Sequence, residues 1–411
     1  MKLRINKIMA TMFAVVAFGG FASCSDDDFG PSIFDKTDYP LDRTAYTFPL
    51  DTFVKANFLE PYNMKYMYKM EDVGSDMDYN LVPCTYDKCV TLATLCKYLW
   101  YDVYNDVVGL EFLKKYSPRI IHVIGSPAYN PSSGTETLGT AEGGLKITLY
   151  NGNELNPADI ENLNEKFFKT MHHEFSHILN QHVNRPTDFD LLSNGKYNVT
   201  NWQDTPDSVA VGQGFITPYG SSQAGEDWVE IIANYIVKDD HTWSRMMNSA
   251  EYEWEEVDYN AKDFDKAVRE GALRDTLGYY VKVGSRSGGE VETYKIVRKV
   301  ISRDDMTGTA ITNSDGKFIF LDNDGVNGRQ LIQQKLDMVR EWLKTNFNYD
   351  LDDLRDAVQK RQWVTDEKGD YVFDSNGNFI NNLTYRRADG TTLMDELRGE
   401  IEKFKELQNN N

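Results

Sequence analysis

The sequence has little basic charge for its acidic content. Its 411 residues include 44 Lys and Arg against 64 Asp and Glu, which gives a formal net charge of −20. This excess of negative charge argues against nucleic acid and anionic lipid head groups as partners. Because 41% of the residues are hydrophobic and 13% aromatic, the chain can build a substantial core in one large domain or two modest ones. We expect a folded, globular protein.

Cysteine is also scarce, with four residues in the chain. Apart from Cys24, the others are Cys84, Cys89 and Cys96, which lie close together in sequence. Three thiols cannot all pair, and no fourth ligand nearby would complete a zinc knuckle. We expect buried free thiols, with at most one local disulfide in an oxidising compartment.

The N-terminus has an apolar segment, Ile8 to Phe18, that is too short to span a bilayer permanently. Basic residues precede it, and small residues follow it up to Cys24, as in a lipoprotein signal peptide. We predict that residues 1–23 are this signal peptide and that Cys24 is the lipidated first residue of the mature protein. A plain secretory signal, with Cys24 incidental, is the alternative.

An acidic cluster follows Cys24 directly, in the sequence Ser-Asp-Asp-Asp. It resembles the export signal that directs lipoproteins of Bacteroidetes-type bacteria to the outer face of the outer membrane, although a solvated charged linker needs no such role. We expect residues 24–48 to form a tether and the protein to be an outer-membrane lipoprotein exposed at the cell surface, attached to the membrane by its lipid alone.

Histidine is rare, yet four of the six histidines lie within residues 172–182. His173, Glu174 and His177 form the pattern H-E-x-x-H, inside a segment whose apolar periodicity predicts a helix from about residue 157 to 182. Residues four apart share one face of a helix, so both imidazoles can bind one ion while Glu174 lies beside the open coordination position. The pattern predicts one catalytic Zn²⁺, with Glu174 as the general base.

A catalytic zinc requires a third protein ligand. His182 is the nearest candidate, but on a continuing helix it would point away from the other two histidines. A second predicted helix begins near Glu226 and carries Glu230 one turn later. One of these carboxylates can bind zinc while the other accepts the free ring N–H of a ligating histidine.

The segment from Gly214 to Glu230 resembles the catalytic end of anthrax lethal factor-like zinc metalloproteases. A tyrosine, a glutamate seven residues later and a second glutamate four further on match that family. The resemblance implies that Glu226 is the third metal ligand, Glu230 the residue behind a ligating histidine, and Tyr219 a catalytic residue whose hydroxyl stabilises the oxyanion.

The chain from about residue 48 resembles a family of Bacteroidetes lipoproteins described as substrate import-associated zinc metallohydrolases or putative zinc-binding metallopeptidases. The similarity includes Glu60–Asn63, Gly139–Gly144, His172–Gln181 and Gly214–Glu230. It implies an α+β, zincin-like fold, a neighbouring outer-membrane nutrient importer and a surface-binding lipoprotein as partners.

We predict a catalytic domain at residues 49–290 and a C-terminal region of hairpin and helices, 291–411, packed on it. The alternating segment from Leu145 to Tyr150 predicts a strand before the active-site helix. Zincins present a sheet edge there, so we expect an extended substrate to pair with Lys146, Ile147, Thr148 and Leu149.

The favoured function is hydrolysis of peptide or glycopeptide amide bonds by a surface-anchored zinc metallopeptidase. One alternative is a non-catalytic surface lipoprotein that captures glycans or peptides for import, with zinc merely structural. Another is an amidase that acts on cell-wall peptides, which uses the same metal chemistry.

Overall fold

The computed structural model describes residues 41–70, 80–129, 136–137, 139–142, 145–260, 280–283, 293–304, 306–320 and 325–409. The chain divides into two units, Met1–Ala45 and Tyr46–Asn411. The predicted signal peptide and Cys24 lie outside the described residues. No helix in the described part of the chain is long and apolar enough to cross a membrane.

A four-stranded sheet lies beside the H-E-x-x-H helix, in the order β1-β2-β6-β5. Its strands are β1 (Lys65–Met67), β2 (Ile120–Val123), β6 (Lys146–Leu149) and β5 (Gly139–Glu142). The first three are parallel, whereas β5 runs antiparallel to β6. The interior strands β2 and β6 are mostly buried, as expected for strands covered on both faces. The strand predicted at 145–150 is therefore present, but it is not an edge strand.

The first helices of this unit enclose an aromatic core. They are α2 (Phe48–Val54), η2 (Lys55–Leu59), α3 (Glu60–Tyr62), α4 (Tyr86–Cys96), η3 (Lys97–Tyr101), α5 (Asp102–Val107) and α6 (Leu110–Tyr116). Gly109 separates α5 from α6, because it has φ of +106°, a conformation that glycine adopts without strain, immediately before α6. Cys84, Cys89 and Cys96 are buried and free.

The H-E-x-x-H helix forms in three pieces. Asp159 caps α7 (Ile160–Leu163), a wider π-helical turn η5 (Asn164–Phe168) follows, and α8 (Lys169–His182) completes the segment. The apolar side chains of α8 are buried while its polar tail reaches the surface. Val183 is extended, so His182 is the last helical residue.

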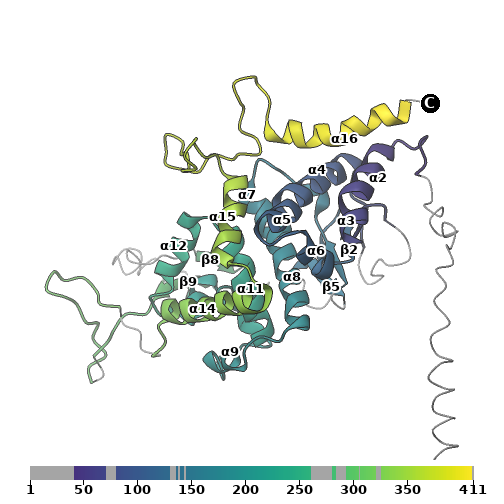
Figure 1. The fold of residues 1–411 in the computed structure, drawn as a ribbon. Helices are drawn as coiled ribbons and strands as arrows, with labels where there is room; N and C mark the ends of the chain where they lie inside the picture. Colours follow the sequence, from purple (N-terminus) through teal and green to yellow (C-terminus); the bar gives the residue numbers. More distant parts are fainter. Residues whose placement is uncertain are drawn as a thin grey trace, which may run out of the picture. The chain divides into compact units, whose positions relative to one another are not determined.

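Short helical elements follow α8. They are α9 (Thr187–Leu192), η6 (Trp202–Asp204), α10 (Asp207–Gly212) and η7 (Tyr219–Ser222). Next comes α11 (Ala224–Val237), almost entirely buried, which packs along α8. The two helices that carry the predicted ligands are thus direct neighbours (Figure 1).

The remaining elements belong to the same compact unit. They are β3 (Ala128–Tyr129), β4 (Glu136–Thr137), η4 (Gly152–Glu154), α12 (Asp240–Ser249), β7 (Trp254–Asn260), β8 (Tyr280–Val283), β9 (Thr293–Lys299), α14 (Gly328–Phe347), α15 (Leu351–Gln362) and α16 (Leu393–Asn409). The second sheet is antiparallel, in the order β7-β9-β8. The predicted α+β class is confirmed.

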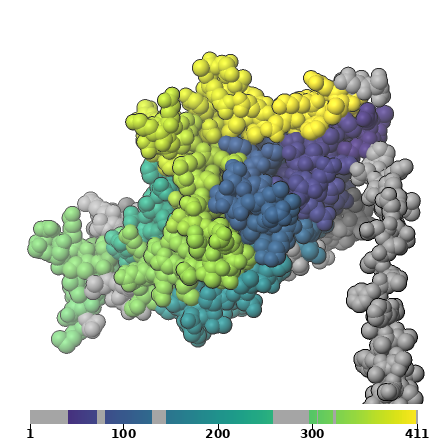
Figure 2. Space-filling view, viewed as in Figure 1, coloured from purple at the N-terminus to yellow at the C-terminus, as the bar shows by residue number. Residues whose placement is uncertain are grey.

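The C-terminal helices pack on the first half of this unit. Helix α15 contacts α5 and α11, and α16 contacts α2 and α4. Figure 2 shows the yellow C-terminal residues lying over the purple and blue residues of α2 and α4. One apolar core includes Trp228 of α11, Trp342 of α14 and Ile401 of α16. No separate core divides residues 291–411 from the rest in the described part of the chain.

Candidate metal centre

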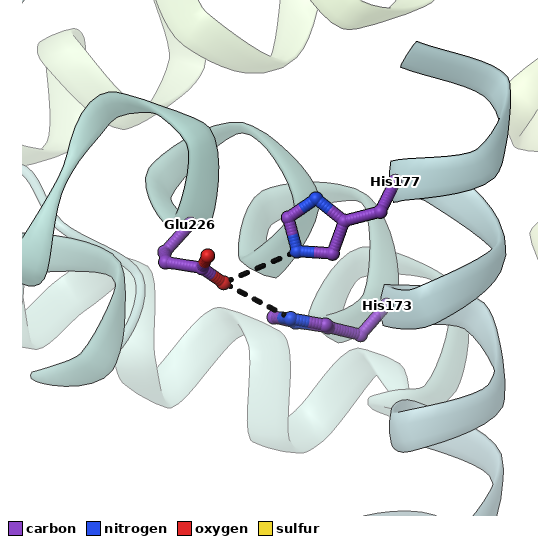
Figure 3. Close-up of side chains that lie close together, drawn as sticks. All are labelled: His173, His177 and Glu226. Atoms are coloured by element: carbon purple, nitrogen blue, oxygen red, sulfur yellow. Dashed lines mark hydrogen bonds and ion pairs between the residues drawn. The ribbon is translucent and has the colours of Figure 1, made fainter. Parts of the chain in front are cut away.

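Three predicted ligands meet between α8 and α11. The available donor atoms of His173, His177 and Glu226 all lie within 4.8 Å of one another. Glu226 Oε2 is 3.1 Å from His173 Nε2 and 3.3 Å from His177 Nε2 (Figure 3). The i, i+4 spacing on α8 aligns the two imidazoles, and the first turn of α11 brings the carboxylate to them.

The donor set fits zinc. Two imidazole nitrogens and one carboxylate oxygen form the protein ligand set of one class of catalytic zinc sites, which leaves a further position for water or substrate. His173 and Glu226 are buried, while His177 remains partly exposed on the open side. The carboxylates of Glu226 and Glu230, both buried, lie beside the imidazoles and favour a positive charge there.

Glu230 holds His173 from behind. Its Oε1 accepts a 2.7 Å hydrogen bond from His173 Nδ1, which leaves Nε2 to face Glu226 and His177. Glu230 Oε2 in turn accepts hydrogen bonds from Thr217 Oγ1, at 2.6 Å, and from Asn234 Nδ2, at 3.2 Å. A carboxylate on the second ring nitrogen fixes the tautomer and orientation of a metal-binding histidine.

The electrostatics of these groups are strongly coupled. Burial opposes the charge of Glu230, but Lys169 and the hydrogen bond with His173 outweigh burial and lower its pKa to about 2. Burial likewise opposes charge on His173, yet Glu226 and Glu230 raise its pKa to about 10. Burial also disfavours an ionised Glu226, although the two histidines hold its pKa well below the usual range. Glu226 and Glu230 thus favour a positive charge at His173.

Glu174 and Tyr219 complete the predicted set. Burial raises the pKa of Glu174, while the nearby histidines favour its ionised form. Tyr219 opens η7, stacks against the His173 ring at 5.8 Å and has its hydroxyl beside Glu226. At 37% exposure, Tyr219 lies on the open side of the site. The base and the hydroxyl thus lie beside the three donor groups.

His182 does not join the site. It is exposed at the end of α8 and contacts Tyr116 edge-on at 5.0 Å. Its separation from the metal cluster agrees with the expectation from helical geometry.

The predicted substrate-pairing strand is wrong in its position. Strand β6, with Lys146 to Leu149, pairs with β2 on one side and β5 on the other, so its backbone is fully engaged in the sheet. Strand β5 lies at the end of the described sheet and contacts α8. The prediction failed because β5 lies within a glycine-rich stretch, and such a composition predicts a loop and not a strand.

Several supporting residues were not predicted. Thr217 fixes Glu230, Lys169 supplies positive charge beside it, and Trp202 packs on Tyr219 with ring centroids 4.8 Å apart. The i−4 position of Lys169 relative to His173 was a signal that could have been used. Thr217 and Trp202 reach the site through tertiary folding, and no local pattern marks them.

The fold and the donor set together define a class: a mixed α+β protein with a His-His-Glu site suited to zinc. A family model described as putative zinc-binding metallo-peptidase matches residues 43–352, and the chain belongs to this family. The chain is also similar to the crystal structure of a putative zinc-binding metallo-peptidase from Bacteroides caccae. The two share 31% sequence identity with a TM-score of 0.52, over 76% of this chain and 91% of that chain. The comparison with curated proteins gives no match.

Proposed function

We propose that the protein is a zinc metallopeptidase of the glutamate-zincin type that hydrolyses peptide or glycopeptide amide bonds. The observation that carries the proposal is the convergence of His173, His177 and Glu226, with Glu230 buried behind His173. Family membership supports zinc and hydrolysis, and the lethal factor-like arrangement of Tyr219, Glu226 and Glu230 supports the peptidase type.

His173, His177 and Glu226 would hold the metal, which when bound supplies a Lewis acid and lowers the pKa of water. Glu174 accepts the proton of the attacking water and then delivers it to the leaving amine. Its buried position and raised pKa suit both transfers. Tyr219 donates a hydrogen bond to the oxyanion that develops on the carbonyl oxygen. Glu230 keeps His173 oriented throughout.

The substrate is proposed to bind as an extended strand against β5, not β6. An extended peptide adds to a free sheet edge through its backbone, and β5 is the strand of the described sheet that both ends it and contacts α8. Edge pairing places a backbone carbonyl beside the site with little dependence on the peptide's side chains.

We further propose that the protein is anchored by Cys24 at the cell surface and acts beside an outer-membrane importer and a surface-binding lipoprotein. The signal-peptide pattern and the acidic residues after Cys24 support this placement. Cys24→Ser should release the protein from the membrane fraction, and an unchanged distribution would contradict lipid anchoring.

The test of catalysis is Glu174→Gln, profiled against a peptide library. Zinc content should be unchanged, because Glu174 is not among the three donor groups, while turnover should fall by about 10²–10⁴-fold. Glu161→Gln, an exposed carboxylate on α7, is the matched control and should retain activity. Unchanged cleavage by Glu174→Gln would refute the assignment, and a zinc-loaded wild type that cleaves no peptide would favour the capture protein.

A further inference from the structure

Lys335 is an unusual residue because its side chain is completely buried on α14, more than a hundred positions after the metal site. Its ammonium donates a 2.6 Å hydrogen bond to Asp227 Oδ2, which is also fully buried, and a 2.8 Å bond to the carbonyl oxygen of Gly214. The same ammonium lies 4.3 Å from the ring centroid of Phe215. A buried ammonium requires such partners, since the loss of its hydration costs about several kcal/mol.

The two acceptors of Lys335 each lie in a segment that carries predicted site residues. Asp227 directly follows the predicted ligand Glu226 in the first turn of α11. Gly214 opens the short segment that leads to Thr217, which bonds Glu230, and then to Tyr219. The ammonium therefore joins α11, which carries Glu226, to the segment that carries Tyr219.

Helix α14 also fixes this segment by direct packing. Gly214 has φ of +86°, and a Cβ at this position would come within 2.5 Å of Leu331 Cδ2 on α14. The glycine thus permits both the left-handed turn and the close approach of the helix. A third segment meets the same carboxylate, because Tyr197, from the loop that carries Trp202, donates to Asp227 Oδ2 at 3.2 Å.

We propose that Lys335 is a positioning residue for the metal site, which fixes Glu226 and Tyr219 relative to each other through Asp227 and Gly214. The inference rests on the proposed zinc function and extends it to the C-terminal helices. A buried ion pair adds little net stability compared with apolar side chains of similar size, so its value lies in the single geometry that it enforces. Helix α14 would thus contribute to the metal site through Lys335, although it carries no predicted metal ligand.

The test compares zinc affinity and local exchange in Lys335→Met with those in Leu343→Ala. The control truncates a fully buried side chain two turns further along the same helix, so it lowers stability while Lys335 keeps its bonds to Asp227 and Gly214. By chelator competition, Lys335→Met should weaken zinc binding by about tenfold or more. Leu343→Ala should leave the zinc dissociation constant within about threefold of the wild type.

A second variant separates positioning from stability. Lys335→Met leaves the buried Asp227 carboxylate with the Tyr197 hydroxyl but without its ammonium, which is strongly destabilising. The double variant Lys335→Met with Asp227→Asn removes that charge, so it should regain thermal stability but not zinc affinity. Recovery of zinc affinity together with stability would overturn the proposal, as would equal zinc affinity in Lys335→Met and the wild type.

Amide hydrogen exchange can be measured in the metal-free protein, so it tests the positioning role of Lys335 without relying on zinc binding. In the metal-free protein, residues 214–230 should exchange faster in Lys335→Met than in Leu343→Ala, and equal rates would overturn the positioning role. A wild-type protein that binds no zinc would instead refute the proposed function, and the exchange rates would still decide whether Lys335 fixes this segment.

Discussion

At the residue scale, the candidate metal site places two buried carboxylates around one imidazole, His173. His173 lies between Glu226 and Glu230, at 3.1 and 2.7 Å. Without metal, the two carboxylates stabilise a proton on this imidazole and raise its pKa to about 10, even though burial opposes that charge. Protons and zinc therefore compete for His173, and zinc binding should strengthen as pH rises.

This competition predicts how the metal-free protein responds to pH. Because the folded pKa of His173 lies above its unfolded value of about 6.5, its contribution to stability is complete below that pH and is lost as pH rises through 10. The melting temperature of the EDTA-treated protein should fall by about 5 °C or more between pH 6 and pH 9.5, as measured by calorimetry.

His173→Gln is the control for this measurement, since it removes the titrating ring. The fall in melting temperature over the same pH interval should be smaller in this variant. An equal fall would show that other groups, and not His173, set the pH dependence.

The sequence predicts the candidate ligands of the site, but it does not predict the residues that hold these ligands in position. In H-E-x-x-H and in the two glutamates of α11, the paired residues are four positions apart. Residues four apart lie on the same face of a helix, so the spacing alone predicts that they lie close together. Thr217 and Lys335 meet Glu230 and Asp227 across 13 and 108 positions. Such contacts depend on how the whole chain folds, so no local pattern reports them.

At the element scale, helices were easier to predict than strand order. The helices predicted at about 157–182 and from near Glu226 lie close to their predicted positions, at 160–182 and 224–237, since apolar periodicity marks a helix directly. Strand order is a property of pairing between distant segments. The short strand β5 lies in a glycine-rich stretch, and because it pairs beyond β6, the last strand of the described sheet is β5 and not β6.

The edge position of β5 predicts where an inhibitor should protect the backbone. A peptide with a zinc-chelating hydroxamate should slow amide exchange in Gly139–Glu142 by about tenfold or more, because its backbone bonds to the edge strand. Exchange in Lys146–Leu149 should change little, since β6 is already paired on both sides.

The interior strand β2, Ile120–Val123, provides a reference within the same sample. Protection of β6 or β2 in preference to β5 would contradict edge binding at β5. Use of a hydroxamate without the peptide would separate the effect of strand pairing from that of metal chelation.

At the scale of the whole molecule, the described residues of the second unit share one large core, beside a small cluster of Ile124, Ala128 and Tyr150. Residues of α14, α15 and α16 share this core with the helices around the metal site. Trp342 packs edge-on against Trp228 at 5.2 Å, and Arg355 donates a hydrogen bond to the carbonyl oxygen of Tyr235. The C-terminal helices therefore cover apolar surface that the site helices cannot bury alone.

A chain that ends at residue 290 should accordingly fail to fold cooperatively. It lacks the partners of Trp228 and Asp227, so it exposes apolar surface and leaves a buried carboxylate without its ammonium. Urea unfolding should show one transition for residues 46–411 and none for residues 46–290. A cooperative transition with zinc binding in the shorter chain would show that 291–411 is dispensable.

The central claim is that His173, His177 and Glu226 bind one zinc ion, and zinc content per chain tests it most directly. The measurement is elemental analysis of protein loaded with zinc and then dialysed at neutral pH. The wild type and Glu161→Gln should each retain about one zinc, and Glu226→Ala should retain much less, because it removes one of three protein ligands. A wild type without zinc, or a Glu226→Ala variant that binds it as tightly, would contradict the claim.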